Sequence, residues 1–426
     1  MNSIDTKTIR MGGLAPTGVV LGGLVGLGGI AASIALGADE SGWTNFWKSY
    51  IFAFMVITGI SLGGLFFVML QHITRAGWSV VVRRLSEGFA SNLRWLWIAF
   101  VPVIILVWSG EGAVLYPWAD PVVVQNDPVL LKKAGYLDPT FWSIRAICFL
   151  FIWAALAQFF VGQSIRQDSD GDVSRTRRMQ AAAPVGILLY GISQTFAGID
   201  WVMTLEPTWF STMFGVYWFA VSLTGFFSCL ILLACFLQSA GRLKGAISKD
   251  HYQDMGKLLF AFGVVFWAYI GYSQFMLIWY ANIPIETGWF LPRQMGPWKW
   301  VSLLLILGHF ALPFVLLVSR WPKRWKNALA AIALWMVLMM IVDVYWLVMP
   351  TMSAKAVHDA TNLMELVDAV DAGTLSVGWN LTVTNFTALV GMLGLLVAGT
   401  CAGLWRCSLV PAADPRLDES LAFENL

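Results

Sequence analysis

Few side chains in this sequence are suited to proton transfer, and those few lie in or next to long apolar runs. Glu111, Asp200 and Asp343 each lie near the end of such a run, and Glu206 and Glu286 follow just beyond two others. An ionised carboxylate in hydrocarbon costs roughly 3 kcal/mol unless it is paired, protonated or wetted, and a desolvated carboxylate is suited to exchange protons. We therefore expect the first three to form a polar cluster that passes protons. The alternative, a carboxylate that reaches headgroup water, fits Glu206 and Glu286 better.

The four histidines limit the haem chemistry that the chain could support. Only His309 lies in the middle of an apolar run, whereas His72 lies at the end of one and the others lie between runs. A membrane haem held by two histidines needs ligands at matching depth on facing helices, so we exclude such a haem. His309 is either a proton-relay group or a histidine that bonds to a neighbouring helix. Candidate stepping stones towards the other membrane surface are His72, Tyr190, Ser193 and Gln194.

The cysteines give no sign of a metal or redox centre. They stand at positions 148, 229, 235, 401 and 407 and form no CxxC pair. This spacing predicts no disulfide framework, zinc site or iron–sulfur cluster. We therefore expect the chain to bind no metal and no redox cofactor of its own.

The composition is that of a membrane protein. Of the 426 residues, 58% are hydrophobic and only 12% are charged, and the mean hydropathy is +0.69. A soluble domain carries about 25% charged residues, so lipid rather than water must surround much of this chain. The near balance of 27 basic and 25 acidic residues argues against a nucleic acid as partner.

Ten apolar runs are long enough to cross a bilayer. We expect membrane helices near residues 13–37, 50–72, 94–116, 141–163, 182–203, 209–238, 256–281, 298–319, 326–349 and 379–404. Lys7 and Arg10 precede the first run, as they would in a cleaved secretory signal, which is the alternative for this segment. The run is much longer than the apolar region of a signal peptide, so we predict a membrane helix.

The basic residues predict the orientation of these helices. With the N-terminus in the cytoplasm, 20 of the 27 lysines and arginines fall in cytoplasmic segments. Basic residues are retained preferentially on the cytoplasmic side. The pattern therefore predicts an even number of spans with both termini cytoplasmic.

Features outside the spans predict further elements. In residues 78–89 apolar residues recur at helical spacing with Arg83, Arg84 and Glu87 opposite, which predicts an interfacial helix. Residues 353–370 predict an acidic outer helix that covers the protein or contacts a partner. Tryptophans at the run ends are typical of an aromatic belt, namely Trp43, Trp47, Trp118, Trp209, Trp289, Trp298, Trp321 and Trp325.

Glycines at four-residue spacing mark the first and last runs. The first run carries Gly18, Gly22 and Gly26, and the last carries Gly399 and Gly403. Such seams let helix backbones approach closely. Both helices are therefore expected to pack on other helices, either within the chain or at a subunit interface.

A weak internal repeat predicts the architecture. Asp200 precedes a Pro-Thr pair at 207–208 by seven residues, and Asp343 precedes another at 350–351 by the same spacing. Thr58-Gly59 and Thr224-Gly225 lie early in the second and sixth runs and agree with the same pairing of helices. We therefore expect a single all-α membrane domain (1–426) of two four-helix bundles in parallel repeat, residues 50–203 and 209–349. The first helix and a last helix with its tail (379–426) flank them. This repeat argues against an inverted-repeat transporter, because a repeat of four helices keeps its orientation.

Several long segments resemble one family of membrane proteins. They are residues 61–72 (SLGGLFFVMLQH) with 74–78 (TRAGW), 200–217 (DWVMTLEPTWFSTMFGVY), 278–287 (IWYANIPIET) and 415–425 (PRLDESLAFEN). These are similar to the polysulfide-reductase-type, or NrfD-like, membrane subunits. More narrowly, they resemble the ActF branch of that family, which belongs to alternative complex III. The segments reach from the second run to the C-terminus, so the resemblance covers nearly the whole chain.

The resemblance implies a fold, a complex and a role. NrfD-like subunits consist of two four-helix bundles without haem, in the bacterial cytoplasmic membrane. Alternative complex III is a respiratory quinol oxidoreductase that also contains a homologous NrfD-like subunit, an iron–sulfur subunit and c-type haem subunits. This chain is then expected to stabilise the complex and to carry protons through Asp200, Glu206 and Asp343, with quinol as a ligand less directly implied. Ile285 departs from the pattern, since an acidic residue is expected there, and leaves Glu286 alone.

Two other functions remain open on the sequence. The chain could be a purely structural scaffold of that complex, in which case neutralising Asp200 or Asp343 would leave turnover unchanged. It could also be a free-standing transporter with parallel repeats, which predicts broken helices around a ligand site at mid-membrane. The only interruption of that kind is His309 with Pro313.

Overall fold

The chain is helical throughout the part that its computed structural model describes, which is residues 8–37, 43–350, 363–375, 377 and 381–425. The long helices are α1 (Leu14–Gly37), α2 (Thr44–Thr74), α3 (Val80–Ala90), α4 (Leu96–Trp108), α7 (Pro139–Asp170), α8 (Ser174–Trp201), α9 (Phe214–Ser239), α10 (Lys249–Leu258), α11 (Trp267–Ala281), α14 (Trp298–Leu304), α15 (Leu312–Val318), α17 (Lys326–Val348) and α20 (Val383–Leu404). Short helices are α5 (Pro121–Asn126), α6 (Pro128–Lys133), α12 (Pro284–Thr287), α13 (Leu291–Gln294), α16 (Arg320–Arg324), α19 (Leu363–Asp371) and α21 (Leu417–Leu421).

Two of the long helices contain π-helical segments. Segment η5 (Leu259–Phe266) joins α10 to α11, and segment η6 (Leu305–Ala311) joins α14 to α15. A π segment widens the helix by one residue per turn and is found mostly at functional sites. Both segments contact each other and α9 or α17, so the two irregularities lie at one place in the molecule.

The prediction of ten membrane helices is confirmed for the described residues, where ten helices are long and apolar enough to cross a bilayer. Four of these helices extend beyond the apolar run that predicted them, namely Thr44–Thr74, Pro139–Asp170, Ser174–Leu205 and Lys249–Ala281. The helix expected at 141–163, for example, spans Pro139–Asp170. The Asp138 side chain accepts from the Phe141 amide at its start, and Gly171 ends it with φ 68°. Backbone hydrogen bonds continue a helix into the polar zone, so hydropathy alone underestimates its length.

The third span differs from its predicted position. It comprises α3, a 3₁₀ turn (Ser91–Arg94) and α4, and it ends at Trp108 instead of residue 116. Gly110 follows with φ 83°, a left-handed conformation that ends the helix. Glu111 therefore lies outside the helix and is exposed to solvent.

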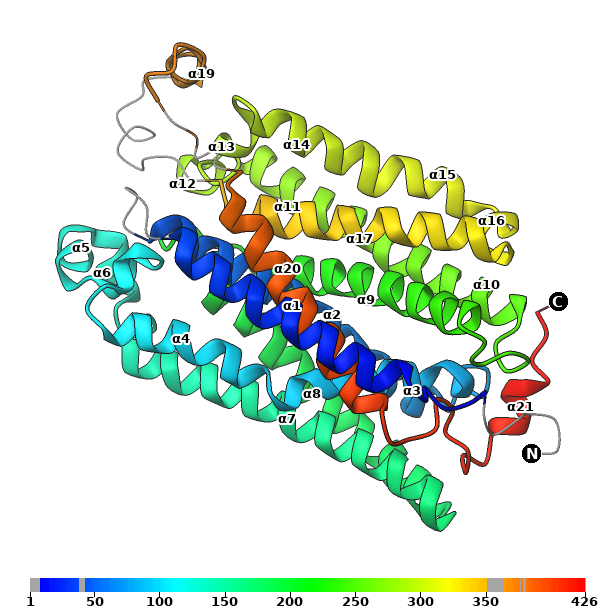
Figure 1. The fold of residues 1–426 in the computed structure, drawn as a ribbon. Helices are drawn as coiled ribbons and strands as arrows, with labels where there is room; N and C mark the ends of the chain where they lie inside the picture. The colour runs from blue at the N-terminus through cyan, green and yellow to red at the C-terminus, as the bar shows by residue number, and fades with distance from the viewer. Residues whose placement is uncertain (1–7, 38–42, 351–362, 376, 378–380, 426) are drawn as a thin grey trace.

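Both ends of the described chain lie at the same face of the molecule, as an even number of spans requires. The amide of Leu409 donates to the Ile9 carbonyl at 2.7 Å, and the Asn425 side chain donates to the Asp250 carbonyl at 3.2 Å. We call this the terminal face; it lies on the right in Figure 1, with α3, α10 and α21. The short helices α5, α6, α12, α13 and α19 lie at the other end, which we call the distal face (Figure 1).

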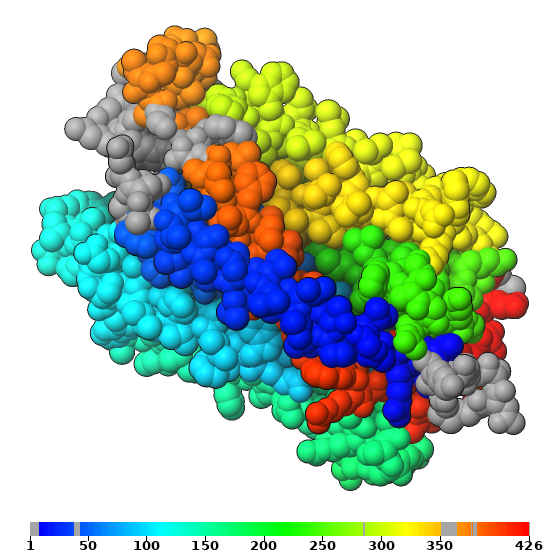
Figure 2. All heavy atoms as spheres, in the orientation of Figure 1, coloured from blue at the N-terminus to red at the C-terminus, as the bar shows by residue number. Residues whose placement is uncertain are grey.

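Helix α2 lies at the centre of the molecule, and α1 and α20 cross its front as a pair. Nearly all of α2 is buried, and it contacts α3, α8, α9, α17 and α20. Figures 1 and 2 show α1 and α20 side by side across the boundary between the α4–α7–α8 group and the α9–α17 group. The outer surface of α1 stays apolar and exposed, with Leu24 at 66% and Leu27 at 69% exposure, which suits contact with lipid or another subunit.

The glycine seams predicted in the first and last runs form their contacts within the chain. A Cβ on Gly29 would lie 2.6 Å from the Cα of Gly391, and one on Gly22 would lie 2.8 Å from the Gly394 carbonyl oxygen. Gly399 and Gly403 instead face Asn92 and Ser91, beside α3. Backbone contact at this distance between α1 and α20 is only open to glycine.

Replacing Gly29 by Val is expected to separate α1 from α20 and to destabilise the protein by about 1–3 kcal/mol, since the clash is with backbone atoms that cannot yield. Gly28→Val is the matched control, because a Cβ there meets nothing within 4 Å. Thermal unfolding of the two purified variants in detergent measures the difference. Equal melting temperatures would contradict the assignment of this seam.

The prediction of an interfacial helix at 78–89 is wrong. Helix α3 forms there, but every one of its residues is buried, including Arg83, Arg84 and Glu87. The charges find partners within the protein, so the polar side of α3 needs no water. A polar stripe on an isolated helix cannot reveal whether solvent or other segments will satisfy it.

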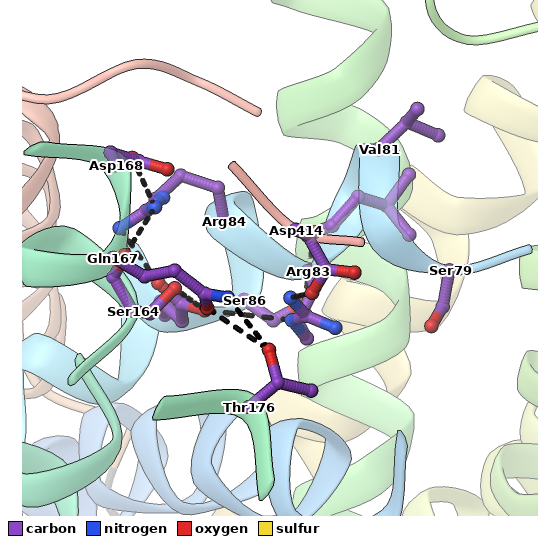
Figure 3. Close-up of polar contacts among 12 residues, drawn as sticks. Ser79, Val81, Arg83, Arg84, Ser86, Ser164, Gln167, Asp168, Thr176 and Asp414 are labelled. Carbon is purple, nitrogen blue, oxygen red and sulfur yellow. Dashed lines mark hydrogen bonds and ion pairs between the residues drawn. The ribbon is translucent and has the colours of Figure 1, made fainter. Parts of the chain in front are cut away.

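These partners come from α7 and the C-terminal tail, as Figure 3 shows. Arg84 pairs with Asp168 at 2.5 Å and with Glu87 at 3.0 Å, while Arg83 pairs with Asp414. The Ser164 hydroxyl donates to Glu87 at 2.8 Å. A buried charge is tolerated only with such partners. The network therefore fastens the tail to the terminal face.

The structure tests part of the predicted outer helix and part of the predicted aromatic belt. Most of the outer helix expected at 353–370 lies outside the described residues, which show α19 from Leu363 to Asp371. The aromatic belt is only partly confirmed: Trp43, Trp321 and Trp325 are exposed, whereas Trp118, Trp209, Trp289 and Trp298 are buried. A tryptophan at the end of an apolar run can be exposed or buried, because short helices at the distal face cover some of these run ends.

Candidate functional site

Asp343, near the distal end of α17, lies at the centre of a fully buried polar cluster. The Tyr217 hydroxyl on α9 donates to Oδ1 at 2.7 Å, and Nε1 of Trp267 on α11 donates to Oδ2 at 2.6 Å. Nδ1 of His309 in η6 lies 3.5 Å from Oδ2. Asp343 and His309 are both 0% exposed. Four helices that are distant in sequence thus bring one carboxyl and one imidazole together.

His309 is held by the two π segments. Its Nε2 lies 3.2 Å from the Gly263 carbonyl oxygen in η5 and 3.4 Å from the Thr224 hydroxyl. Its ring stacks on Trp267, with centroids 3.9 Å apart and planes at 12°. At Gly263 a Cβ would lie 3.2 Å from Thr224, so this position keeps α9 close. The irregular helices therefore position the imidazole against the carboxyl.

This arrangement has the chemistry of a shared proton. A carbonyl oxygen only accepts, so the geometry assigns the ring hydrogen to Nε2, facing Gly263. Nδ1 then faces Oδ2 of Asp343, and it makes no hydrogen bond with any described residue. Two lone pairs at this distance repel unless a proton lies on one of them. Asp343 and His309 together can therefore take up and release one proton.

Asp200, a second buried carboxylate, on α8, has a different environment. Arg145 of α7 binds it through two hydrogen bonds, Nε to Oδ2 at 2.7 Å and Nη2 to Oδ1 at 3.1 Å. The Tyr136 hydroxyl donates to Oδ1 at 2.8 Å, and the guanidinium lies 3.8 Å from the Tyr136 ring centre. A bidentate arginine holds a carboxylate in its ionised form. Asp200 is thus built as a structural ion pair.

The predicted cluster of Glu111, Asp200 and Asp343 does not form. Glu111 is exposed, and throughout the described chain no hydrogen bond or ion pair connects Asp200 with Asp343. Among the predicted stepping stones, the Ser193 hydroxyl donates to the Tyr190 backbone carbonyl at 3.2 Å, but no hydrogen bond joins two of their side chains within the described residues. Ser193 accepts from Trp153, Gln194 donates to the Gly215 carbonyl, and His72 stacks on Phe160 at the terminal face.

Glu206 lies at the distal face, half-buried, between α8 and α9. Burial raises the pKa of its carboxyl, while the positive charges of Arg293 and Lys48 oppose that rise. Burial also lowers the pKa of the Arg293 guanidinium to about 9, so it stays charged near neutral pH. Arg293 donates to three backbone carbonyls, those of Trp289, Trp346 and Leu347, at 2.6–3.2 Å. Arg293 therefore places a fixed positive charge at the distal end of the α9–α17 group.

The raised pKa of Glu206 predicts a pH-dependent stability. A carboxyl whose folded-state pKa lies above its unfolded value, about 4.3, stabilises the fold below that value and loses this contribution as the pH rises through the folded-state pKa. Glu206→Gln is therefore expected to gain stability relative to the native protein between pH 4 and 8. Melting temperatures across this range measure the difference, with Glu286→Gln as control. A difference that stays constant or falls would contradict the assigned environment.

A cavity of about 670 Å³ lies directly beside the Asp343 cluster. Tyr217 and Trp267, which both donate to Asp343, line it, and Arg293 and Ser302 add polar groups. The rest of the lining is aromatic and aliphatic, and its rim includes the exposed residues Tyr272 and Ile306. This volume and lining suit a lipophilic organic molecule that enters from the apolar surface.

The sequence did not indicate Tyr217, Trp267, Arg145 or Arg293 as site residues. Tyr217 and Trp267 look like ordinary aromatic residues of membrane helices, and nothing in their spacing connects them to Asp343. Arg145 gives the clearest signal that could have been used, since it is a basic residue seven positions into a membrane helix. Such a residue must have a partner. No group of three or more metal-ligating side chains occurs within the described residues.

The comparisons with known proteins leave the family open. No protein-family model matches the chain, and no curated protein matches it. The chain is therefore established as an all-helical protein with ten candidate membrane spans in its described residues and a buried Asp343–His309 pair.

Proposed function

We propose that this chain is a proton-conducting membrane subunit of a respiratory quinol oxidoreductase of the alternative complex III type. The observation that carries the proposal is the buried Asp343–His309 pair, in which Nδ1 of the imidazole lies 3.5 Å from Oδ2 of the carboxyl beside a lipophilic cavity. The resemblance of residues 61–78, 200–217, 278–287 and 415–425 to NrfD-like subunits supports the assignment to this complex. The chain binds no redox cofactor of its own in this proposal.

The proposed architecture is two parallel four-helix bundles, α2–α8 and α9–α17, with α1 and α20 as flanking helices. The corresponding residues Thr58 and Thr224 support it, since each donates to the carbonyl four residues earlier on α2 and α9. Asp200 and Asp343 also support it, because each lies near the distal end of its helix and accepts a tyrosine hydroxyl. In this proposal the bundles have diverged in the basic partner of the carboxylate, which is arginine for Asp200 and histidine for Asp343.

The proposed location is the bacterial cytoplasmic membrane, with the terminal face in the cytoplasm. The basic residues of the terminal face support this orientation. The proposed partners are a homologous NrfD-like subunit, an iron–sulfur subunit and c-type haem subunits, in addition to membrane lipids. The exposed apolar surface of α1 is available for one such contact.

The proposed mechanism uses the residues around Asp343 in turn. Tyr217 and Trp267 hold the carboxyl by two hydrogen bonds, and both residues also line the cavity. Asp343 accepts a proton from the side of the cavity, and His309 takes it from Oδ2 through Nδ1. The Gly263 carbonyl stabilises the resulting imidazolium through Nε2–H. Quinol, when it binds in the cavity, supplies the electrons to partner subunits and the protons to this site.

A second candidate, a free-standing transporter, is favoured by one observation. The π segments η5 and η6 interrupt two helices next to the cavity, as a mid-membrane ligand site requires. Purification in mild detergent from the native membrane separates the two. A co-purifying c-type haem that is reduced by added quinol supports the complex. A haem-free single polypeptide would contradict it and favour the transporter.

A further inference from the structure

A second cavity, of about 520 Å³, lies at the terminal face between the end of α2 and the start of α8. Its polar lining is His72 and Arg75 from α2 and the segment after it, and Arg177 and Gln180 from α8. Ile73, Ala181 and Pro184 form the apolar part of its wall. Two separate helices thus direct basic and hydrogen-bonding groups to one hollow.

The basic groups of this cavity have no counter-charge among the residues that the structure describes. Neither Arg75 nor Arg177 takes part in an ion pair there, although neighbouring arginines do. Arg175 pairs with Asp170 at 2.5 Å and Arg84 with Asp168 at 2.5 Å, so the nearby carboxylates are already engaged. The cavity therefore carries a net positive charge.

His72 supplies the second observation. Its side chain is only 2% exposed, and its Nε2 has no hydrogen-bond partner within the described part of the chain. Its ring is fixed by stacking on Phe160, with planes at 25°. A buried polar atom without a partner is unfavourable, so a ligand oxygen at this place would satisfy it.

The surface beyond the cavity is apolar along the same side of α8. Arg177, Ala181 and Pro184 are followed at helical spacing by Leu188 and Ile192, which are 64% and 52% exposed. A ligand that enters the cavity with a charged end can therefore lay an aliphatic chain along α8. A free anion would leave this surface uncovered.

We propose that this cavity binds the headgroup phosphate of an anionic glycerophospholipid. Arg75 and Arg177 contact the phosphate oxygens, Gln180 and His72 Nε2 bond to the remaining headgroup oxygens, and an acyl chain follows Leu188 and Ile192. Basic pockets between membrane helices are known to recognise lipid headgroups in this way. The site is independent of the proton-conducting role, since it shares no residue with the Asp343 cluster and its test does not measure turnover.

Native mass spectrometry of the delipidated full-length chain in detergent tests the proposal. The probes are phosphatidylglycerol, phosphatidylcholine and inorganic phosphate, added separately to the native protein, Arg75→Gln, Arg177→Gln and the double variant. Arg178→Gln is the matched control, because Arg178 is an exposed arginine on the same helix that does not line the cavity. Each cavity arginine is expected to contribute about five-fold to phosphatidylglycerol affinity.

The expected result is tight binding of phosphatidylglycerol that weakens about 25-fold in the double variant and stays unchanged in Arg178→Gln. Added salt should weaken it further, because the contacts are partly exposed. Equal affinity for phosphatidylcholine, or a double variant that binds as well as the control, would overturn the proposal. Competition by millimolar inorganic phosphate without any dependence on acyl chains would show a free-anion site and overturn the assignment to a lipid.

Discussion

Replacing Asp343 by Asn is expected to reduce proton release coupled to quinol oxidation by on the order of 10²-fold, with the protein still folded. Asparagine has the same shape and keeps one oxygen that accepts from either the Tyr217 or the Trp267 donor, so the surrounding packing is preserved. It cannot bind and release a proton, which removes the group that faces His309. Stopped-flow measurement of pH in vesicles that contain the purified complex, together with its haem reduction rate, gives the effect.

The control for Asp343→Asn is Glu111→Gln. Glu111 is a carboxylate of the same predicted set, but it lies exposed on the distal face, so its loss is expected to leave proton release unchanged. Haem content and melting temperature should stay at native values in both variants. Normal proton release by Asp343→Asn would show that this chain acts as a scaffold. An equal loss in both variants would show that the Asp343 cluster has no special role.

His309→Phe extends this test to the second member of the pair. Phenylalanine retains an aromatic face against Trp267, which lies 3.9 Å from the imidazole centre, but it has no nitrogen to accept a proton. The variant is expected to fold and to lose proton release to a similar extent as Asp343→Asn. The double variant should then lose no more than either single variant, because both residues act in one step.

Replacing Asp200 by Asn is expected to have the opposite signature, namely a loss of stability of about 3–5 kcal/mol. The change leaves the Arg145 guanidinium, which is 11% exposed, without its carboxylate partner. An uncompensated buried cation is far more costly than the loss of one hydrogen bond. Thermal unfolding and the yield of folded protein measure the effect, and turnover per folded molecule is expected to stay near the native value.

The double variant Asp200→Asn with Arg145→Gln is the control for this prediction. It removes both charges, so it is expected to recover a large part of the stability that the single variant loses. A stable Asp200→Asn that fails in proton release would contradict the structural role and return Asp200 to the proton path. The Asp200→Asn and Asp343→Asn experiments together distinguish a carboxylate that stabilises the fold from one that carries protons.

The contrast between Asp200 and Asp343 shows how two buried carboxylates near the distal ends of membrane helices can serve different purposes. Each carboxylate accepts a tyrosine hydroxyl near the distal end of a membrane helix. Arg145 then supplies a permanent positive charge to Asp200, whereas His309 supplies a group that can gain or lose its charge. A carboxylate next to a titratable partner can exchange protons, and one next to arginine stays ionised.

The C-terminal tail has a structural role that its polar sequence does not suggest. Asp414 pairs with Arg83, and the Ser420 hydroxyl donates to the Trp78 carbonyl at 2.6 Å and accepts from the Val81 amide at 3.3 Å. These contacts close the polar side of α3, so the tail completes the buried part of the fold. They give a physical reason for the specific sequence of residues 414–420.

The amino-acid sequence by itself determined the class of the protein and the number of its spans. Ten long apolar runs leave helices as the only stable form in a bilayer, since each backbone polar group must be satisfied within its own segment. The glycines at 18, 22 and 26 likewise predicted close contact for α1, because the need for bare backbone is a local property. The partner helix, α20, was only partly foreseeable from its own glycines.

Only the tertiary structure decided which polar residues meet. The partners of Asp343 lie 34 to 126 positions away along the chain, and those of Arg83 and Arg84 lie up to 331 positions away. Spacing in sequence determines which residues share a face of one helix, but the packing of several helices determines which faces meet. For this reason the burial of α3, the ion pair of Asp200 and the joining of His309 to Asp343 follow from the fold and not from any local pattern.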